Sequence, residues 1–486
     1  NLSMVNFPVF ADENNAEMMK LYSQSATGIS RDIMWPSLVS IVEKSGMKMT
    51  CFIQPQADYT DDVEPETGNL EFYLKQMKEQ STEAGISLEY QKLYKAEDKV
   101  TKDTEFFEKE GTNYRFGAAF AKEKEIDLCI VGMDDPLVGG VVDAFESEGL
   151  RVFGPRKNAA IIEGSKAFSK DLMKKYKIPT AAYENFTDPD EAIKYLETAK
   201  MPIVLKADGL ALGKGVLICN TLEEAKEGVK TLMLDKQFGD AGNEIVIEEF
   251  MTGREVSVLA FCDGKTIKCM TSAQDHKRAK DGDQGLNTGG MGTFSPSPFY
   301  NDEVEAFCEK YVYQSTIDAM ASEGRPFTGI LFTGLMITED GPKVLEYNAR
   351  FGDPEAQVVL PRMKNDIIDV MEACIDGKLS DVELEFEDNA AVCVVLASDG
   401  YPEKYDKGFE IKGLDTFKDK DGYYVFHAGT KFDGDKIVTN GGRVLGVVAK
   451  GENLKAARAN AYKATEWIDF ANKYKRNDIG KAIDEA

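Results

Sequence analysis

Two polar residues in the segment LEYNARFGDPE have the types and spacing to bind a metal ion. Glu346 and Asn348 are two positions apart on a predicted strand, so their side chains project from the same face. A carboxylate and an amide carbonyl are oxygen ligands that Mg²⁺ takes together with substrate phosphates. An exposed strand face with two polar residues is the alternative interpretation. Arg350 could bind a carboxylate or phosphate through two hydrogen bonds, or pair with Asp353 within the loop.

The segment ADGLALGKG, between two predicted strands, could surround a phosphate group. Gly209, Gly213 and Gly215 allow the backbone to approach an oxyanion closely, and Lys214 adds a positive charge. The spacing differs from a Walker A loop, because only three residues separate Gly209 from Gly213. A glycine-rich hairpin without a ligand fits the pattern about as well. Lys206, at the end of an otherwise apolar strand, either extends to solvent or faces a cleft.

Two further segments carry residues suited to a nucleotide or an anionic substrate. The segment QDHKRAKDGDQGLNTGGMG has several basic residues, in an acidic chain, followed by glycines. A solvated charged loop is one interpretation, but the length and glycine content favour a loop that closes an active site. In IEEFMTGREVS, Glu248 ends an apolar strand and Glu255 begins the next. A carboxylate and nearby backbone at such a junction could bind an adenine amino group and ribose hydroxyls. Taken singly, surface glutamates are the simpler interpretation.

The composition excludes some classes of function for this chain. The 486 residues allow about three domains of ~150 residues each. With 58 basic against 84 acidic residues the net charge is −26, which argues against binding to a nucleic-acid backbone. A local cluster of lysine and arginine can still bind a small anion. His276 and His427 are the only histidines, which excludes a multi-histidine metal site.

The sequence also indicates a location and a state of assembly. No apolar run approaches the ~20 residues that span a bilayer. The eight cysteines form no CxxC pair and are typical of reduced thiols. We expect a cytoplasmic protein, a monomer or weak homodimer, with no membrane or nucleic-acid partner.

The elements that must position these residues form an alternating α/β pattern. A βαβ unit is predicted from a strand at 127–132, a turn at 133–136, a helical stretch at 137–149 and a strand at 150–155. A smaller αβ module follows, in which Thr221 and Glu224 have capping-box spacing.

Hairpins and a last domain complete the expected elements. Hairpins are predicted at 244–270, turning at Asp263-Gly264, and at 328–349, turning near Asp340-Gly341. From about residue 388, short strands and a final amphipathic helix predict a separate C-terminal domain.

In this order, the segments resemble the ATP-grasp superfamily and, within it, the phosphoribosylamine–glycine ligase family. The resemblance runs from about residue 123 to the end of the chain. The matching phrases are VFGPRKNAAIIEGSKAFSKDLM, IVLKADGLALGKGV, IVIEEFMTGREVS, QDHKRAKDGDQGLNTGGMGTFSP, TGILFTGLMI, LEYNARFGDPEAQ, FHAGTK and TNGGRVL.

The resemblance implies an α/β fold in four parts. An ATP-grasp domain would follow a βαβ, Rossmann-like N-terminal domain and precede a small C-terminal α+β domain. The expected limits are 1–115 for a divergent N-terminal segment, 116–163 for the rest of the βαβ domain, 164–385 for the ATP-grasp domain with a flexible nucleotide-covering module at 181–250, and 386–486 for the C-terminal domain. Within 1–115, a strand is expected at 47–55 and a helix at 69–85.

The resemblance also implies ATP-dependent joining of glycine to 5-phosphoribosylamine in purine biosynthesis, with Mg²⁺ or Mn²⁺. Residues expected at ATP are Lys166, Lys206, Asp208, Gly209, Gly213, Lys214, Gly215, Glu248, Glu249, Phe250 and Glu255. Glu346 and Asn348 would bind the metal. Residues expected at the glycine and sugar-phosphate side are Asp275, His276, Lys277, Arg278, Asn287, Thr288, Gly289, Gly290, Arg350 and Asp353, of which Lys277, Arg278, Arg350 and Asp353 are the catalytic candidates.

The sequence departs from the family at its start. The family opens with a strand and a glycine-rich loop containing an Arg-Glu-His run, and residues 1–115 hold no histidine. Met133-Asp134 stands where the family usually has Pro-Glu. Two alternatives therefore stay open: a carboxylate–amine ligase that uses another amine, and a nucleotide-binding protein without turnover.

Overall fold

The computed structural model describes residues 125–210 and 215–484, together with Leu2–Ser3, Gln54–Pro55, Ala118 and 121–122. The chain divides into two compact units, Asn1–Glu125 and Ile126–Ala486. In the first unit β1 (Leu2–Ser3) and β2 (Gln54–Pro55) pair antiparallel, so the described end of the strand expected at 47–55 is a strand. The helix expected at 69–85 lies outside the described residues. The second unit carries the predicted site.

The second unit begins with the predicted βαβ arrangement, in which two parallel strands are joined by two helices. These are β3 (Cys129–Ile130), α5 (Asp134–Gly139), α6 (Val141–Ser147) and β4 (Val152–Phe153). Helix α5 starts inside the turn expected at 133–136, because Asp134 and Asp135 in its first turn interact favourably with the helix dipole. Gly140, with φ of +96°, ends α5 in the left-handed conformation that glycine adopts at little cost.

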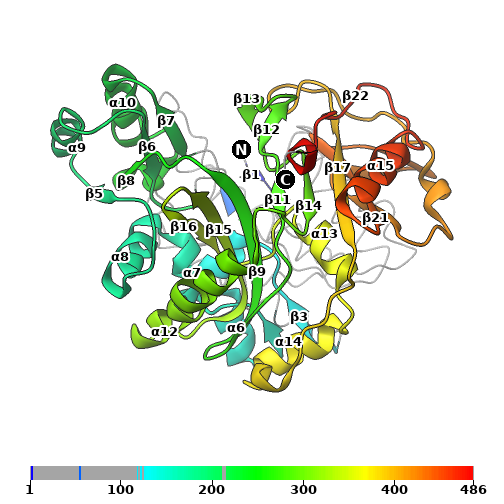
Figure 1. Ribbon diagram of the computed structural model, residues 1–486, viewed down its shortest axis with the longest axis horizontal. Helices are drawn as coiled ribbons and strands as arrows, with labels where there is room; N and C mark the ends of the chain where they lie inside the picture. The colour runs from blue at the N-terminus through cyan, green and yellow to red at the C-terminus, as the bar shows by residue number, and fades with distance from the viewer. Residues whose placement is uncertain are drawn as a thin grey trace, which may run out of the picture. The chain divides into compact units, whose positions relative to one another are not determined.

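A small antiparallel sheet of order β5-β8-β6-β7 follows, with helices beside it (Figure 1). Its elements are β5 (Tyr183–Phe186), α9 (Pro189–Leu196), β6 (Ile203–Ala207), β7 (Val216–Cys219), α10 (Leu222–Val229) and β8 (Ile245–Glu249). The predicted cap is confirmed at α10, where Glu224 N donates to Thr221 Oγ1 at 3.2 Å. The Glu224 carboxylate accepts from Asn220 N at 2.7 Å, one residue ahead of the N-cap. Apolar side chains of α9, α10 and the strands form one core, which makes this sheet a module of its own.

The central antiparallel sheet has the order β10-β9-β15-β16, so β16 forms one edge. Its strands are β9 (Arg254–Asp263), β10 (Ile267–Cys269), β15 (Thr328–Thr338) and β16 (Gly341–Asn348). The hairpins turning after Asp263 and near Gly341 are confirmed. The start of the predicted 244–270 hairpin is instead β8, which pairs with the small sheet. Helices α7 (Lys157–Gly164), α8 (Lys166–Tyr176) and α11 (Asp302–Cys308) contact β16.

The C-terminal sheet has the order β11-β14-β17-β21-β18, with β22 also paired to β17. Its strands are β11 (Gln274–Asp275), β14 (Gly292–Ser295), β17 (Ala390–Ser398), β18 (Tyr423–His427), β21 (Arg443–Gly451) and β22 (Lys473–Tyr474). Strand β17 is buried throughout because Cys393 packs into the core of the central sheet while Val392 and Val394 pack beneath α15 (Leu454–Thr465). The sheet therefore joins segments about a hundred residues apart, Thr293 lying opposite Cys393.

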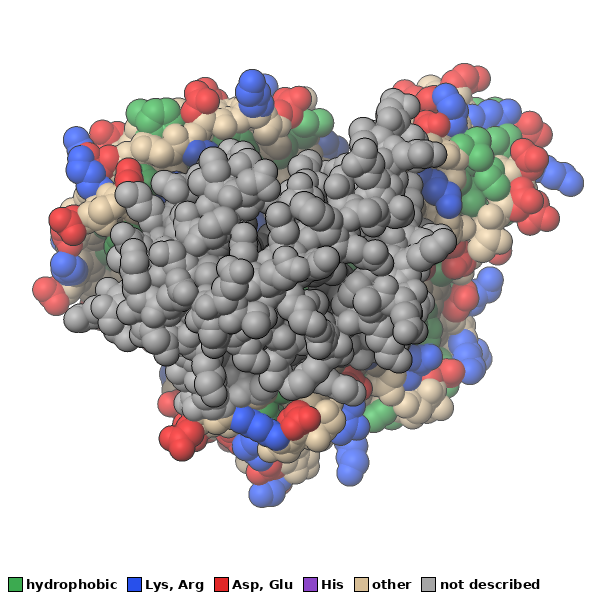
Figure 2. Space-filling model, turned by 180° about the vertical axis from the view of Figure 1, so that it is seen from behind, with side chains coloured by type: hydrophobic (Ala, Val, Ile, Leu, Met, Phe, Trp, Pro, Cys, Tyr) green, Lys and Arg blue, Asp and Glu red, His purple; other side chains and the backbone are tan. Residues whose placement is uncertain are grey.

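Shorter elements connect these sheets. They are α12 (Gln314–Ser322), α13 (Ala356–Val359), α14 (Ile367–Ile375) and two hairpins, β12 (Arg278–Lys280) with β13 (Gln284–Asn287) and β19 (Thr430–Asp433) with β20 (Lys436–Thr439). None of the described helices has the length and apolar composition needed to cross a bilayer. On the face shown in Figure 2, acidic and basic side chains alternate around the rim of the described surface.

Candidate active site

The predicted nucleotide residues meet where the small sheet approaches the β16 edge of the central sheet. Lys206, the last but one residue of β6, donates from Nζ to the Leu345 carbonyl of β16 at 3.3 Å. Its side chain is only 8% exposed. The structure thus decides between the two sequence interpretations of Lys206: the ammonium faces the interior between the two sheets and does not extend to solvent.

Glu248 lies between two lysines in this junction. Its Oε1 contacts Lys206 Nζ, and its Oε2 lies 2.5 Å from Lys170 Nζ. Burial alone would raise the pKa of Glu248, but the two lysines outweigh it and hold the pKa below its ordinary value. Lys170 also donates to Thr180 Oγ1 at 2.8 Å, and Thr180 donates to the Val344 carbonyl at 2.7 Å. Sequence reasoning missed Lys170, because a lysine inside an amphipathic helix ordinarily faces solvent.

The glycine loop is attached to the start of α8. Lys166 Nζ donates to the Gly209 carbonyl, and Ala167 N donates to Asp208 Oδ1 at 2.9 Å. Asp208 therefore caps the amino end of α8, which leaves one fewer oxygen free for a ligand. Gly209 has φ of +95°, a conformation that a side chain would strain. Gly215 accepts from Ala207 N at 2.8 Å, whereas Gly213 and Lys214 lie outside the described residues.

The residues expected at the nucleoside line the connection from β8 to β9. Glu249 accepts from Ala182 N at 3.1 Å and lies 3.3 Å from Lys343 Nζ. Phe250 exposes 38% of its surface, and Glu255 Oε2 lies 3.5 Å from Lys277 Nζ. This connection is thus close to the central sheet, and it carries one exposed aromatic ring.

Glu346 of β16 is the acidic centre of the site. Burial would raise its pKa, but Lys277, Lys206, Lys166 and Arg350 together lower it. Lys277 Nζ lies 3.8 Å from Glu346 Oε1. The pKa of Lys277 is raised because Glu255 and Glu346 outweigh the lowering effect of burial. Three of these cations also contact a second carboxylate, Lys206 that of Glu248, Lys277 that of Glu255 and Arg350 that of Glu163, so the site is a cluster of closely paired charges.

The residues predicted to hold a metal fit a cation that is shared with phosphates. Asn348 Oδ1 accepts from Arg350 Nη2 at 3.4 Å. Asn348 shares a face of β16 with Glu346, because buried Tyr347 between them points to the other face. Among the described residues, no three His, Cys, Asp or Glu side chains gather into a metal cage. One carboxylate and one amide oxygen match Mg²⁺, which uses few protein ligands and completes its shell with phosphates and water.

Arg350 and Asp353 do not pair with each other, and each has another partner. Arg350 Nη2 lies 3.3 Å from Glu163 Oε1, at the end of α7, and Glu163 Oε2 accepts from Ala349 N at 2.6 Å. Asp353 Oδ2 accepts from Arg443 Nη2 of β21 at 2.7 Å. The loop clamp considered from the sequence is therefore wrong. Glu163 and Arg443 were missed because their partners lie far away in the chain.

The segment from 274 to 292 contains the hairpin β12–β13 and is held by hydrogen bonds at both ends of that hairpin. Thr288 N donates to the Lys277 carbonyl at 2.7 Å, and Arg443 Nη1 donates to the Gly289 carbonyl at 2.9 Å. A side chain at Gly290 would collide with Asp275 and Pro354, so the chains pack closely there. Asp275, Lys277, Arg278, Asn287 and Thr288 thus lie on one ordered segment.

Both ring nitrogens of His276 have hydrogen-bond partners within the chain. Gly480 N donates to its Nε2 at 3.1 Å, so Nδ1 carries the proton and donates to the Gly292 carbonyl at 3.1 Å. Burial, and then Arg476, lower the pKa of His276 to about 4. The ring is therefore neutral and holds the loop to the C-terminal segment through both nitrogens, and a contact of His276 with the substrate stays a prediction.

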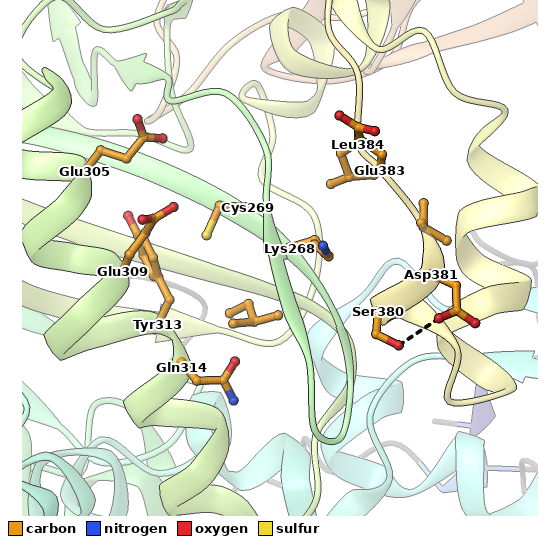
Figure 3. A pocket seen from close by; sticks show the side chains of 12 residues that line it. Lys268, Cys269, Glu305, Glu309, Tyr313, Gln314, Ser380, Asp381, Glu383 and Leu384 are labelled. Atoms are coloured by element: carbon orange, nitrogen blue, oxygen red, sulfur yellow. Dashed lines mark hydrogen bonds between the residues drawn. The ribbon is translucent and has the colours of Figure 1, made fainter.

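A separate pocket of about 790 Å³ lies at the other edge of the central sheet (Figure 3). It is lined by β10, by the segment after α11 and by residues 380–384, including Glu305, Glu309 and Tyr313. Strand order places β10 and β16 at opposite edges of the sheet. This pocket therefore belongs to a different part of the molecule from Glu346 and Asn348.

Sequence models of one family match three successive parts of the chain. The descriptions are phosphoribosylglycinamide synthetase N domain at residues 84–163, ATP-grasp (A) domain at 164–356 and C domain at 391–482. The first match begins at residue 84, ahead of residue 123, where the resemblance in the motifs begins.

Individual relatives agree with these models. The phosphoribosylamine–glycine ligase of Halalkalibacterium halodurans is 51% identical over 368 residues, covering 76% of this chain and 85% of the relative. The crystal structure of phosphoribosylamine–glycine ligase from Thermotoga maritima superposes with a TM-score of 0.63 at 36% identity, covering 68% of this chain and 82% of that one. The biotin carboxylase domain of 2-oxoglutarate carboxylase from Hydrogenobacter thermophilus shares the fold, with a TM-score of 0.59 at 16% identity over 75% of this chain and 79% of that one.

The fold and the cation cluster at β16 define an ATP-grasp enzyme with an N-terminal and a C-terminal domain. The identity over most of the chain narrows this class to an ATP-dependent ligase. The chain belongs to the phosphoribosylamine–glycine ligase family.

Proposed function

We propose that this chain joins glycine to 5-phosphoribosylamine, with ATP as the energy source, giving glycinamide ribonucleotide, ADP and phosphate in purine biosynthesis. The observation that carries the proposal is the position of Glu346, which lies 3.8 Å from Lys277 Nζ. Burial raises its pKa, but Lys277, Lys206, Lys166 and Arg350 together lower it. Such a cluster suits a reaction in which phosphate is transferred and charge must be neutralised.

The reaction needs no nucleophile from the protein. The glycine carboxylate attacks the γ-phosphate of ATP, which releases ADP and forms glycyl phosphate. The amine of 5-phosphoribosylamine then attacks the glycyl carbonyl, and phosphate leaves as the amide forms. Positioning of three ligands and stabilisation of charge account for catalysis in such a sequence. The engaged ring nitrogens of His276 agree with this, since the loop contributes no imidazole base.

The residues divide by the part of ATP that each would contact. Lys166 and Lys206 would bind phosphates, with the loop Asp208 to Gly215 above them. Glu249, Phe250 and Glu255 would hold the nucleoside. Because Glu248 is already neutralised by two lysines, its role is to fix Lys206 and Lys170 while the neighbouring backbone meets the base.

Glu346 Oε1 and Asn348 Oδ1 would bind Mg²⁺ or Mn²⁺. When bound, the ion neutralises phosphate charge and orients the γ-phosphate. Lys277 would stabilise the transferred phosphate beside Glu346, and Arg350, held by Glu163, would bind the glycine carboxylate. Arg278, Asn287, Gly289, Gly290 and Asp353 would line the side occupied by the sugar phosphate.

An isotope experiment tests the proposed sequence of steps. Glycine labelled with ¹⁸O in both carboxylate oxygens is incubated with ATP, magnesium and 5-phosphoribosylamine. The attacking oxygen leaves with phosphate, so the released phosphate should carry one ¹⁸O and the amide product should keep the other. Product formed with unlabelled phosphate would contradict attack by the glycine carboxylate on ATP.

We propose a cytoplasmic location on the state of the thiols. All seven cysteines in the described part of the chain are free, and Cys219, Cys262 and Cys308 are among the buried ones. Free thiols in this number are typical of a reducing compartment. A monomer or weak homodimer stays a prediction from the sequence.

A further inference from the structure

The C-terminal segment from Tyr474 to Gly480 is hydrogen-bonded to β12 and the residues that flank it, near which β22 lies in Figure 1. Tyr474 Oη donates to the Ala279 carbonyl at 2.9 Å. Asn477 N donates to Asp281 Oδ1 at 2.7 Å, and Gly282 N donates to Asp478 Oδ2 at 2.7 Å. With the contact from Gly480 to His276, these bonds connect residues 474–480 to residues 276–282.

Arg476 is the centre of this contact. Its side chain is 1% exposed. Nε and Nη2 donate to the two oxygens of Asp478 at 2.7 Å each, and Nη1 donates to the Arg278 carbonyl at 3.0 Å. Nη1 also lies 3.0 Å from Asp283 Oδ1. The guanidinium thus connects Asp478 of the C-terminal segment to two points of the hairpin: Arg278, where β12 begins, and Asp283, in the turn before β13.

The charges in this contact are balanced. A buried guanidinium without partners would be strongly unfavourable, and a bidentate carboxylate is the arrangement that suits its planar fork. Asp478 and Asp283 raise the pKa of Arg476 even though burial lowers it. Asp478 stays ionised, with its pKa lowered to about 2; burial would raise that pKa, but the hydrogen bond from Arg476 outweighs it. Replacing Arg476 therefore leaves Asp478 buried beside the hairpin without its cation.

The hairpin leads directly to the cluster at Glu346. Lys277 immediately precedes Arg278, and its Nζ lies between Glu255 and Glu346, 3.5 and 3.8 Å away. The Arg278 carbonyl held by Arg476 is therefore one residue from the cation that faces the proposed phosphate position. A shift of about 1 Å in a positioned group can lower a rate on the order of a hundredfold.

We propose that Arg476 is a positioning residue of the ligase reaction: it fixes the hairpin that carries Arg278 and Asn287 on the side of glycine and the amine, and with it Lys277 beside the transferred phosphate. The C-terminal segment thus supports the part of the site that binds glycine and the amine, in addition to packing in the C-terminal core. This inference rests on the proposed function, since it assumes that Lys277 faces the transferred phosphate.

The test compares Arg476→Met, Arg476→Lys and the matched control Lys475→Met. Lys475 is the neighbouring cation in the same tail, but it pairs with Glu466, 3.5 Å away, and not with the hairpin. For Arg476→Met, the KM values for glycine and 5-phosphoribosylamine should rise at least tenfold and kcat should fall, while the KM for ATP changes less than twofold. Arg476→Lys should recover part of the loss, and Lys475→Met should match the unaltered chain.

A second variant covers the case in which Arg476→Met does not fold. Tyr474→Phe removes only the hydroxyl that bonds to Ala279, and it should raise the same two KM values by a smaller factor. Unchanged KM values in both variants, or an equal rise for ATP, would overturn the positioning role. Absence of glycine-dependent ADP release by the unaltered chain would instead overturn the proposed function, so the two failures are distinguishable.

Discussion

Lys170 Nζ lies 2.5 Å from Glu248 Oε2, and each of these side chains exposes only 3% of its surface. The pair joins α8 to the strand β8 of the small sheet. Since Lys206 contacts the other oxygen of Glu248, one carboxylate organises two buried cations. ATP can therefore meet a Lys206 whose side chain is already held in place, which lowers the cost of ordering it on binding.

Lys170→Met should destabilise the fold moderately. Lys206 still neutralises Glu248 in this variant, so the expected loss is that of a hydrogen bond to a charged group, about 1.5–3 kcal/mol. The measurement is the free energy of unfolding in urea. Lys174→Met, on the same helix but with an exposed side chain 3.9 Å from Glu184, should cost less than about 1 kcal/mol. Equal losses in the two variants would show that Glu248 does not depend on Lys170.

Glu346→Ala should lower kcat by on the order of a hundredfold or more, because one hard ligand to the phosphate-bound cation is lost. The fold should persist, since the Glu346 side chain is 38% exposed. Steady-state rates at several magnesium concentrations provide the measurement. Glu339→Ala, in the exposed turn of the same hairpin, is the control. Full activity of Glu346→Ala at ordinary magnesium would remove Glu346 from the site.

Glu163→Gln should change how stability depends on pH. Burial raises the pKa of Glu163 to about 7, although Arg350 lowers it. A folded-state pKa above the unfolded value of about 4.3 means that the native form binds more protons between these values, so unfolding becomes easier as pH rises through this window. Glutamine does not ionise. The free energy of unfolding of the variant, relative to the unaltered chain, should therefore increase from pH 5 to pH 8. A constant difference across this range would contradict the raised pKa.

The pH dependence at His276 has the opposite sign. Its pKa is lowered to about 4, so the neutral ring stabilises the fold above the unfolded pKa of about 6.5, and this stability is lost as pH falls through 4. His276→Gln should flatten this acid loss of stability in thermal unfolding measured from pH 7 to pH 4. If the variant lost as much stability between pH 7 and pH 4 as the unaltered chain, groups other than His276 would be responsible.

Hydrogen exchange tests the movement of the small sheet. The amides of Asp208, Gly209 and β7 should exchange more slowly with ATP and magnesium than without them, because a bound nucleotide holds the glycine loop against α8. The strand β17, buried throughout, serves as the internal reference. Equal exchange of the loop with and without nucleotide would separate it from the ATP site.

Local signals predicted much of the fold. The helix cap at Thr221 and the hairpin turns near Asp263 and Gly341 depend on residues within a few positions of one another, and the structure confirms them. The pairing of β14 with β17 could not be predicted, because residues about a hundred positions apart meet only after the whole chain folds. The same applies to the attachment of the C-terminal segment to β12–β13.

The sequence predicted which side chains share a strand face, but it could not predict which charged side chains pair with one another. Glu346 and Asn348 share one face of β16, as their alternation on a strand requires. A pair between Arg350 and Asp353, three residues away, was one of the two interpretations of the sequence, but in the structure Arg350 lies beside Glu163 and Asp353 beside Arg443. The sequence did not indicate Lys170 as a site residue, because its burial depends on Glu248, which lies on a strand distant in the chain.

The most direct test measures ADP release by the purified chain with ATP and magnesium, adding glycine, 5-phosphoribosylamine, both or neither. Release should be rapid only with both substrates, and glycinamide ribonucleotide should form in equal amount. A chain that binds ATP but releases no ADP under any condition would be a nucleotide-binding protein without turnover. Rapid release with glycine and another amine, but not with 5-phosphoribosylamine, would contradict the proposed substrate.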